Sequence, residues 1–364
     1  MQVTFVPPHI PDILLKDFQP RSLLKRPDNT PEKARFLVVD AHNHLFGDLP
    51  PEELLRIMDA VGVQTWVNVT GNVVLPFDEA GYTIERRPIE GFIDHYVKAY
   101  PGRFTCLTMS EFARWENFGI LAEDDFVDRA IQTFEADVAK GACGFKLTKE
   151  LGLRFRDKTG AMIPVDDARL EPIFRRVEEM GLPTLIHVSD PEGFFIPMDE
   201  TNEHYPVLQE FPSWAFQDSF FSKNELLEQR NRLIARHPKM NFILPHVANS
   251  PEDLDRVASW LDTYSNTYID ISARVDELGR QPYTARDFFI EYQDRILFGI
   301  DMPVSEGAYR AYFRFLETRD EYFEYPDYLG RWGHCRWRIY GLDLPDEALR
   351  KVYHENAERV AQGR

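Results

Sequence analysis

The sequence predicts an α/β fold, a (β/α)8 TIM barrel in which a single domain over residues 36–364 follows an N-terminal arm over 1–35. Short apolar segments recur along the 364-residue chain, each followed by an amphipathic segment, and strands that alternate with helices favour a parallel sheet. Several segments are continuously apolar, as expected for strands buried on both faces. Eight such units indicate a closed barrel. An open doubly wound sheet is the alternative, but no GxGxxG motif follows the first strand.

The expected strands are runs rich in β-branched and aromatic residues. They cover residues 36–40, 65–69, 104–109, 144–147, 183–187, 241–245, 267–271 and 295–299. The expected helices cover 52–60, 90–100, 124–140, 167–181, 224–237 and 251–262. Four helix-to-strand joints, YPGRF, MGLPT, HPKMNF and YSNTY, carry Gly, Pro or Asn just before the strand, as helix stop signals do.

Two of the strand-to-helix connections are long. Segment 148–165 is predicted to form a hairpin around Asp157–Gly160. Segment 188–222 is rich in aromatic residues, which favours an ordered lid. In a barrel both segments would lie on the C-terminal face, where active sites are built. The Pro-rich arm over 1–35 is expected to be irregular and to wrap on the barrel.

Composition excludes some classes of partner. The formal net charge of −18 argues against nucleic acid or an anionic membrane, because both would repel the protein. The three cysteines are widely spaced and form no CxxC pair, so reduced thiols are expected rather than disulfides. Neither a signal peptide nor an apolar run of about 20 residues is seen, and the protein is expected to be cytoplasmic.

The motif VVDAHNHL at 38–45 places His42 and His44 two residues apart at the end of a strand. Side chains at that spacing point to the same face. Two imidazoles on one side of a barrel mouth form half of a metal site. A single HxH motif is weak evidence, because structural and surface histidines are common.

Three further strands end in an ionisable residue. His187 ends PTLIH, His246 ends NFILPH, and Asp301 ends RILFGID. Burying such a group costs free energy unless the group is paired or bound to a metal. Five ionisable groups that converge on one barrel face favour metal catalysis over a structural network.

This ordered set of motifs resembles the amidohydrolase superfamily, in the branch of single-metal hydrolases and decarboxylases known as amidohydrolase-related or type 2. The resemblance covers nearly the whole chain and runs through DAHNHL, GFKL, PTLIHVSDP, PHVANSPEDL, YIDISAR, RILFGIDMP and YHENAERV. It implies a distorted (β/α)8 barrel that forms one catalytic domain, in agreement with the strand count.

The resemblance also implies roles for the strand-end residues. His42, His44 and His187 are expected to bind one divalent metal, and Asp301 to contact the metal, its bound water or both. His246 is expected beside that water and, with Asp301, to be catalytic. A metal lowers the pKa of bound water towards about 7, and a neighbouring carboxylate or imidazole takes the remaining proton. Zinc is the expected ion, with manganese or another divalent ion as the alternative.

Two cationic residues at strand ends are predicted to bind substrate. Lys146 occupies the position of the carboxylated lysine of two-metal relatives, and a contact to substrate or to a carboxylate is preferred over a second metal. Arg274 suits a substrate oxyanion held by two hydrogen bonds. A salt bridge of Arg274 to Asp270, Asp276 or Glu277 is weighed equally.

Remaining polar positions carry less weight. Asn249 stands where many relatives have small glycines after the strand-six histidine, and is expected to add a polar contact or to form a turn. The histidines without strand-end context are assigned no catalytic role, although His204 lies in the aromatic segment. These residues are His9, His95, His204, His237, His334 and His354.

The first hypothesis is a metal-dependent hydrolase that cleaves a lactone, ester or amide bond of a small organic substrate with a metal-activated water. The alternative is a metal-dependent, non-oxidative decarboxylase of a small carboxylic acid, aromatic or not. A third hypothesis is a non-catalytic barrel that acts as a binding or scaffold protein. It is disfavoured, because a barrel that had lost its catalytic activity need not retain all five strand-end groups. A small-molecule substrate and a homodimer are expected, and fold and metal site do not fix the reaction.

Overall fold

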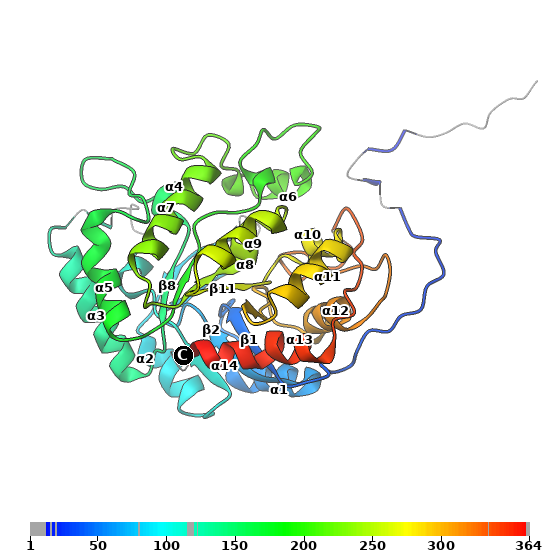
Figure 1. Cartoon of the computed structure of the whole chain (residues 1–364), viewed down its shortest axis with the longest axis horizontal. Helices are drawn as coiled ribbons and strands as arrows, with labels where there is room; N and C mark the ends of the chain where they lie inside the picture. Colours follow the sequence, from blue (N-terminus) through cyan, green and yellow to red (C-terminus); the bar gives the residue numbers. More distant parts are fainter. Residues whose placement is uncertain are drawn as a thin grey trace, which may run out of the picture.

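The computed structural model describes residues 12–14, 17–18, 20–78, 81–114, 120–121, 123–333 and 335–361 (Figure 1). Each of the eight expected strands is present, and its observed range overlaps the expected one. The strands are β1 (Val38–Asn43), β2 (Val63–Asn68), β7 (Phe104–Cys106), β8 (Phe145–Leu147), β9 (Thr184–Ile186), β10 (Phe242–Leu244), β11 (Thr267–Asp270) and β12 (Ile296–Leu297). All pairings between them are parallel.

The strands pair in chain order as two sheets, β1-β2-β7 and β8-β9-β10-β11-β12. Hydrogen bonds join these sheets at both seams. Between β7 and β8, the Lys146 N–H donates to Thr108 O at 2.9 Å, and between β12 and β1 the Asp301 N–H donates to His42 O at 3.0 Å. A Cβ on Gly299 would lie 2.9 Å from the His42 Cβ, so glycine permits the close approach at the second seam. The predicted barrel is therefore closed.

Helices cover the outside of the barrel (Figure 1). The six expected ones correspond to α1 (Pro51–Val61), α2 (Ile89–Phe92) with its π-helical extension (Ile93–Val97), α3 (Phe126–Lys140), α5 (Glu171–Glu179), α7 (Lys223–Arg236) and α9 (Leu254–Thr263). The fold also contains α4 (Glu150–Leu153), α6 (Tyr205–Glu210), α8 (Pro245–Ala248), α10 (Val275–Gly279), α11 (Pro282–Glu291), α12 (Glu306–Glu317), α13 (Asp346–Arg350), a second π-helical turn (Lys351–Glu355) and α14 (Asn356–Ala361). None of the described helices is long and apolar enough to span a bilayer.

Two layers of apolar side chains hold the barrel together. The larger layer lies between the strands and the surrounding helices. The smaller one contains inward-facing strand residues such as Val67, Leu185 and Ile243, and Val360 of α14 packs against it. Figure 1 shows α14 beside the lower end of β1. This packing leaves the other end of the barrel, at the carboxyl ends of the strands, free to form a site.

The two long connections are ordered, as predicted. In segment 148–165 the Ile163 N–H donates to Phe155 O, and Gly160 turns the chain with a φ of 84°, which makes the expected hairpin. Segment 188–222 contains α6 and two 3-10 turns, Glu192–Phe194 and Pro212–Trp214. Its apolar side chains form a cluster with Leu153 and Leu226.

The region after β2 contains strands that the sequence did not predict. Two short antiparallel pairs form there: β3 (Val73–Val74) with β6 (Glu85–Arg86), and β4 (Phe77–Asp78) with β5 (Gly81–Tyr82). Strands of two residues are too short to produce an alternating hydrophobic pattern.

The N-terminal arm contacts the barrel over part of its length. Its described residues up to 29 are exposed, and the dark blue segment in Figure 1 extends away from the barrel before it returns. Among the described residues, ion pairs to the barrel domain appear at Arg26, which lies 3.2 Å from Glu321, and at Asp28, which lies 3.5 Å from Arg314. The backbone N–H of Asn29 then donates to Asp320 Oδ2 at 2.8 Å. The arm therefore contacts the barrel from Arg26 onward, whereas the described residues before Arg26 are exposed.

Candidate functional site

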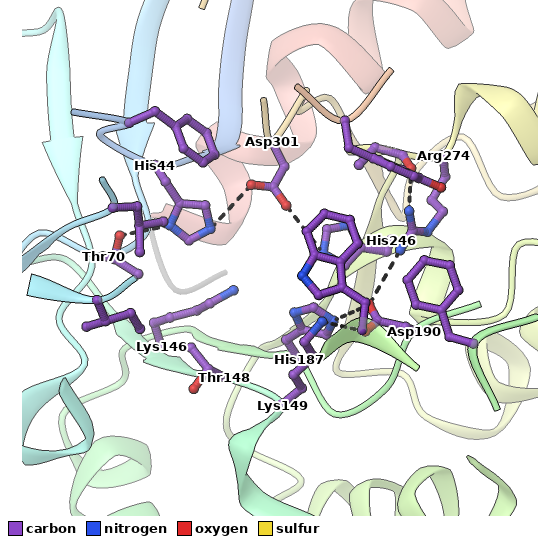
Figure 2. Close-up of a pocket in the computed structure, with 17 residues that line it drawn as sticks. His44, Thr70, Lys146, Thr148, Lys149, His187, Asp190, His246, Arg274 and Asp301 are labelled. Carbon is purple, nitrogen blue, oxygen red and sulfur yellow. Dashed lines mark hydrogen bonds and ion pairs between the residues drawn. The ribbon is translucent and has the colours of Figure 1, made fainter. Parts of the chain in front are cut away.

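A cavity lies at the carboxyl ends of the strands, and polar residues from six strand ends point into it (Figure 2). These residues are His44 after β1, Lys146 in β8, His187 after β9, His246 after β10, Arg274 after β11 and Asp301 after β12. The ends of parallel strands in a barrel form one face, so residues far apart in the sequence meet there. His42 lies beneath them and is fully buried.

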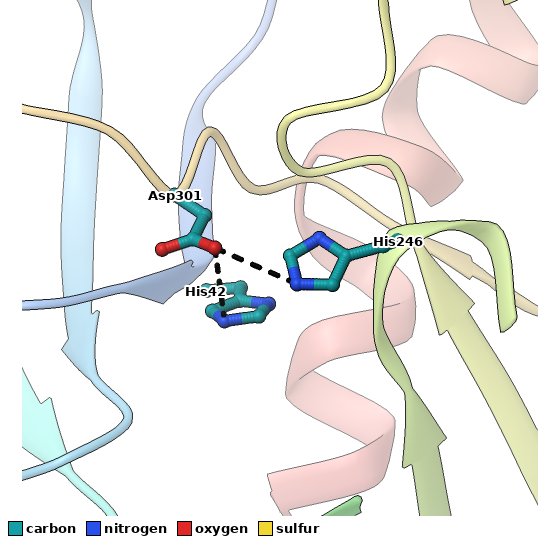
Figure 3. A group of neighbouring side chains, drawn as sticks. All are labelled: His42, His246 and Asp301. Atoms are coloured by element: carbon teal, nitrogen blue, oxygen red, sulfur yellow. Dashed lines mark ion pairs between the residues drawn. The ribbon is translucent and has the colours of Figure 1, made fainter. Parts of the chain in front are cut away.

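Asp301 is the centre of this polar group. Its Oδ1 lies 3.3 Å from His44 Nε2, and its Oδ2 lies 3.5 Å from His246 Nε2 and 3.8 Å from His42 Nε2. Figure 3 shows His42 and His246 directed at the carboxylate. Burial raises the pKa of Asp301 to about 6, so the carboxylate holds a proton more readily than an exposed aspartate does.

The second ring nitrogen of each histidine has a partner of its own. The partners are Asp270 Oδ2 for His42 Nδ1, Thr70 Oγ1 for His44 Nδ1 and the Ser272 carbonyl for His246 Nδ1, each at 2.8 Å. A carbonyl or carboxylate at Nδ1 requires the proton there, which leaves Nε2 with a free lone pair. Histidines that bind metals are oriented in this way.

The three groups His42, His246 and Asp301 could hold a metal ion, because one ligand atom from each lies within 4.8 Å of the others. His42 Nε2 is buried and has no hydrogen-bond partner, an arrangement that costs free energy unless another group occupies the site. Burial also lowers the pKa of both histidines well below the usual value. Neutral imidazoles and a carboxylate are donors that suit a divalent transition metal.

His187 has a different geometry from the other predicted ligands. Its Nε2 contacts the Ser189 carbonyl at 2.8 Å and Asp190 Oδ1 at 3.5 Å. The imidazole packs against His246, with ring centroids 4.6 Å apart, but it is not part of the three-residue group. Its role as a metal ligand therefore remains a prediction, and so does the assignment of His246 to catalysis rather than to binding.

Lys146 extends into the cavity (Figure 2). Its side chain is 1% exposed, and the structure places no hydrogen-bonding or ion-pairing atom of the described residues against its ammonium group. Burial lowers the pKa of Lys146 to about 8. A buried ammonium without a protein partner is suited to bind a substrate anion.

Among the described residues, Arg274 has one acidic partner at contact distance, and it is none of the three that the sequence suggested. The Nη2 atom lies 3.8 Å from Asp190 Oδ1, and the guanidinium lies 5.7 Å from the ring centroid of Tyr328. The salt bridge to Asp270, Asp276 or Glu277 does not form at contact distance. Arg274 Nε is buried without a hydrogen-bond partner, so part of the guanidinium is left for a ligand.

Asp190 connects the cations around the cavity. It contacts Lys149, His187 and Arg274. Burial opposes its ionisation, but Lys149, His187 and Arg274 together outweigh burial and hold the pKa of Asp190 well below the usual value. Sequence reasoning missed Asp190, Thr70 and Ser272, and it named Asp270 only as a partner of Arg274 and not of His42. The available signal was their position just past a strand or at its last residue, in HVSD, NVT and IDIS.

Apolar side chains form the remaining walls of the cavity. Phe194 and Trp214 come from the aromatic segment 188–222, which therefore reaches the site as expected of a lid. The other wall residues of apolar or aromatic character are Phe46, Leu75, Ile84, Ala273 and Tyr328. His204, from the same segment, lines a neighbouring cavity instead. His334 and His9 lie outside the described residues.

Comparisons with known proteins agree with this architecture. A family model described as amidohydrolase, of type 2, matches residues 5–360. No curated protein sequence matches the chain.

Solved structures with the same fold have low sequence identity. An uncharacterised TIM-barrel protein from Bordetella bronchiseptica is 18% identical, covers 86% of this chain and 82% of its own, and has a TM-score of 0.52. A 2,6-dihydroxybenzoate decarboxylase from Rhizobium is 17% identical, covers 91% and 99%, and has a TM-score of 0.52. A dihydroxybenzoic acid decarboxylase from Polaromonas sp. JS666, solved with manganese and 2-nitroresorcinol, is 15% identical, covers 91% and 97%, and has a TM-score of 0.52.

At these identities the solved structures establish the fold alone, a TIM barrel. The family model establishes more, because it matches nearly the whole chain, including every strand that contributes to the cavity. The chain belongs to the amidohydrolase type 2 family and is an enzyme of that family.

Proposed function

We propose that this enzyme is a metal-dependent hydrolase that cleaves a lactone, ester or amide bond in a small substrate carrying a carboxylate. The observation that carries the proposal is the Asp301 carboxylate, surrounded by Nε2 atoms of three histidines at 3.3 to 3.8 Å on the floor of a cavity. An unpaired ammonium, Lys146, lies in the same cavity.

The proposed metal ligands are His42, His246 and Asp301, with His44 beside them and His187 added by the family resemblance. When bound, a divalent metal would polarise the scissile carbonyl and make a water more acidic. We propose zinc, with manganese as the alternative, since a histidine and carboxylate set accepts several ions.

The protein groups provide the proton transfers. Asp301 is the proposed general base, because its carboxylate lies among the three histidine Nε2 atoms, where it can take a proton from the attacking water. His246 donates its Nδ1 proton to the Ser272 carbonyl, so its Nε2 lone pair faces the same space as Asp301. The proton then passes to the leaving oxygen or nitrogen as that bond breaks.

Lys146 and Arg274 are the proposed binding groups for the substrate carboxylate. Asp190 neutralises part of the charge of Arg274 and fixes its position at the cavity wall. The apolar side of the substrate would then lie against Phe194 and Trp214. Exclusion of water by these walls strengthens the charged contacts.

Non-oxidative decarboxylation is the second candidate. The observation that favours it is the combination of aromatic walls with two cations, which suits an aromatic carboxylic acid. Two solved structures with this fold are described as decarboxylases of dihydroxybenzoic acids. In this reaction the bond between carbon and carboxylate breaks, carbon dioxide leaves, and protonated Asp301 or His246 delivers a proton to the electron pair left on carbon.

One experiment separates the two reactions. The purified enzyme, with zinc or manganese added, is incubated with lactones, esters and amides of small acids and with hydroxybenzoic acids. Hydrolysis would place one ¹⁸O from labelled water in the acid product, whereas decarboxylation would release carbon dioxide and place a solvent deuteron on carbon. Turnover of neither group, in a protein that binds metal, would contradict both proposals and favour a barrel that binds without catalysis.

A further inference from the structure

The turn that follows β10 is left-handed over four successive residues. The φ values are 58° at His246, 54° at Val247, 53° at Ala248 and 62° at Asn249. None of the four is glycine, and L-residues avoid this region, β-branched valine most strongly. A run of this length therefore depends on contacts from outside the turn to keep its conformation.

The first residue of the turn is held from β11 and the segment that follows it. The His246 N–H donates to Asp270 Oδ1 at 3.0 Å, and the ring Nδ1 donates to the Ser272 carbonyl at 2.8 Å. Within the turn, the Asn249 N–H donates to the carbonyl of Pro245 at 3.1 Å. These bonds leave the carbonyl of Ala248, in the second half of the turn, to be satisfied by another element.

Arg230 of α7 supplies that contact. Its side chain is 0% exposed, and Nη1 donates to the Ala248 carbonyl at 2.7 Å. The guanidinium lies over the ring of Trp260, 4.4 Å from the centroid, and its other hydrogen bonds go to Asn231 Oδ1. In the described part of the chain, no carboxylate pairs with it.

A buried guanidinium without a counter-charge is costly. Burial also lowers the pKa of Arg230 to about 9. Stacking on Trp260 offsets part of this cost. An apolar side chain, however, would pack at the same place without the cost of burying a charge. The feature that an apolar side chain could not reproduce is the hydrogen bond to the turn.

We propose that Arg230 is a positioning residue: by holding the Ala248 carbonyl, it keeps residues 246–249 left-handed and so directs His246 Nε2 at Asp301. The inference rests on the proposed function, in which His246 belongs to the metal cluster. Figure 3 shows His246 leaving this turn towards Asp301, 3.5 Å away. Arg230 itself does not line the cavity, so its effect passes through the backbone.

The test uses full-length protein stripped of metal and titrated with Mn²⁺ in a calorimeter. The variants are Arg230→Met, Arg230→Lys, and each combined with Ala248→Gly, because glycine adopts a positive φ without strain. Arg232→Met is the matched control, since Arg232 lies on the same helix but is exposed and pairs with Asp166. Melting temperatures are recorded for every variant.

Arg230→Met is expected to weaken Mn²⁺ binding at least tenfold and Arg230→Lys by less, whereas Arg232→Met leaves binding unchanged. Ala248→Gly should restore at least half of the loss on a logarithmic scale. Unchanged Mn²⁺ binding in folded Arg230→Met would overturn the inference. So would a loss that Ala248→Gly fails to rescue, because Arg230 would then act only by packing α7 on α9.

Two further outcomes keep the test decisive. If Arg230→Met does not fold, Arg230→Lys and its rescue by Ala248→Gly decide the question alone. If the wild-type protein binds no Mn²⁺ or Zn²⁺, the proposed function fails first. Wild-type binding with no difference among the variants refutes the positioning role alone.

Discussion

Asp270→Asn is the substitution that examines the cluster most closely without removing a proposed ligand. Asp270 is 1% exposed and accepts hydrogen bonds from His42 Nδ1 at 2.8 Å, the His246 N–H at 3.0 Å and the Ser272 N–H at 3.1 Å. Asparagine has the same size but no charge, and one of its two terminal atoms is a donor. The amide therefore cannot accept all of these bonds.

The expected effect of Asp270→Asn is a 10- to 100-fold weaker metal affinity, about 1.4–2.7 kcal/mol, the usual loss when a partner that orients a metal-binding histidine is changed. Two of the three histidines around Asp301 depend on Asp270, which favours the upper half of this range. Calorimetric titration of metal-free protein with Zn²⁺ or Mn²⁺ measures this loss of affinity, with Asp255→Asn, an exposed residue of α9, as control. Equal affinity in a folded Asp270→Asn protein would refute the orienting role.

Three further predictions concern the cavity. Lys146→Met should raise KM for an anionic substrate about ten- to hundredfold, because a hydrogen bond to a charged group is worth about 1.5–3 kcal/mol; an unchanged KM would remove Lys146 from substrate binding. In the wild type that KM should rise as pH increases through about 8, where Lys146 loses its proton, and a rise that persists in Lys146→Met would assign the titration to another group. A chelator should lower the melting temperature and Zn²⁺ at 100 times Kd should restore about 2.7 kcal/mol; equal melting curves would argue against a resident metal.

The barrel could be predicted because its strands are encoded locally. Runs such as NFILP and RILFGI are continuously apolar, and each is ended by a polar residue that faces the cavity. His246 and Asp301 both stand at that position, and this marks them as candidate site residues. The closed topology was predicted from the count of strand and helix units. That count does not reveal that closure also requires a residue without a Cβ at position 299, where the chain passes close to His42.

The arrangement of the cluster could not be predicted in the same way. Which histidine nitrogens meet at Asp301 depends on side-chain rotation and on partners from other strands, such as Asp270 and Thr70. His187 illustrates the difficulty, because its strand position resembles that of His246 but its Nε2 contacts Ser189 and Asp190. The left-handed turn was also hidden, since the sequence there contains no glycine.

Substrate binding was predicted in part. Lys146 and Arg274 both line the cavity, as their strand ends indicated. The ion pair of Arg274 joins it to Asp190, 84 residues earlier in the sequence (274 − 190), and no local pattern reveals a contact at that separation. The same reason explains why Leu75 and Ile84, which lie next to β3 and β6 in the region after β2, were not expected in the cavity wall.

The most direct test of the central claim is the metal content of the purified protein, measured by elemental analysis beside His42→Ala and Asp301→Ala. The account predicts about one divalent metal per wild-type chain and a sharp reduction in both variants, because each loses a donor of the group at Asp301. Two metals per chain would contradict a mononuclear centre and implicate Lys146 in a second site. No metal in any sample, even after reconstitution, would contradict the metal-dependent mechanism altogether.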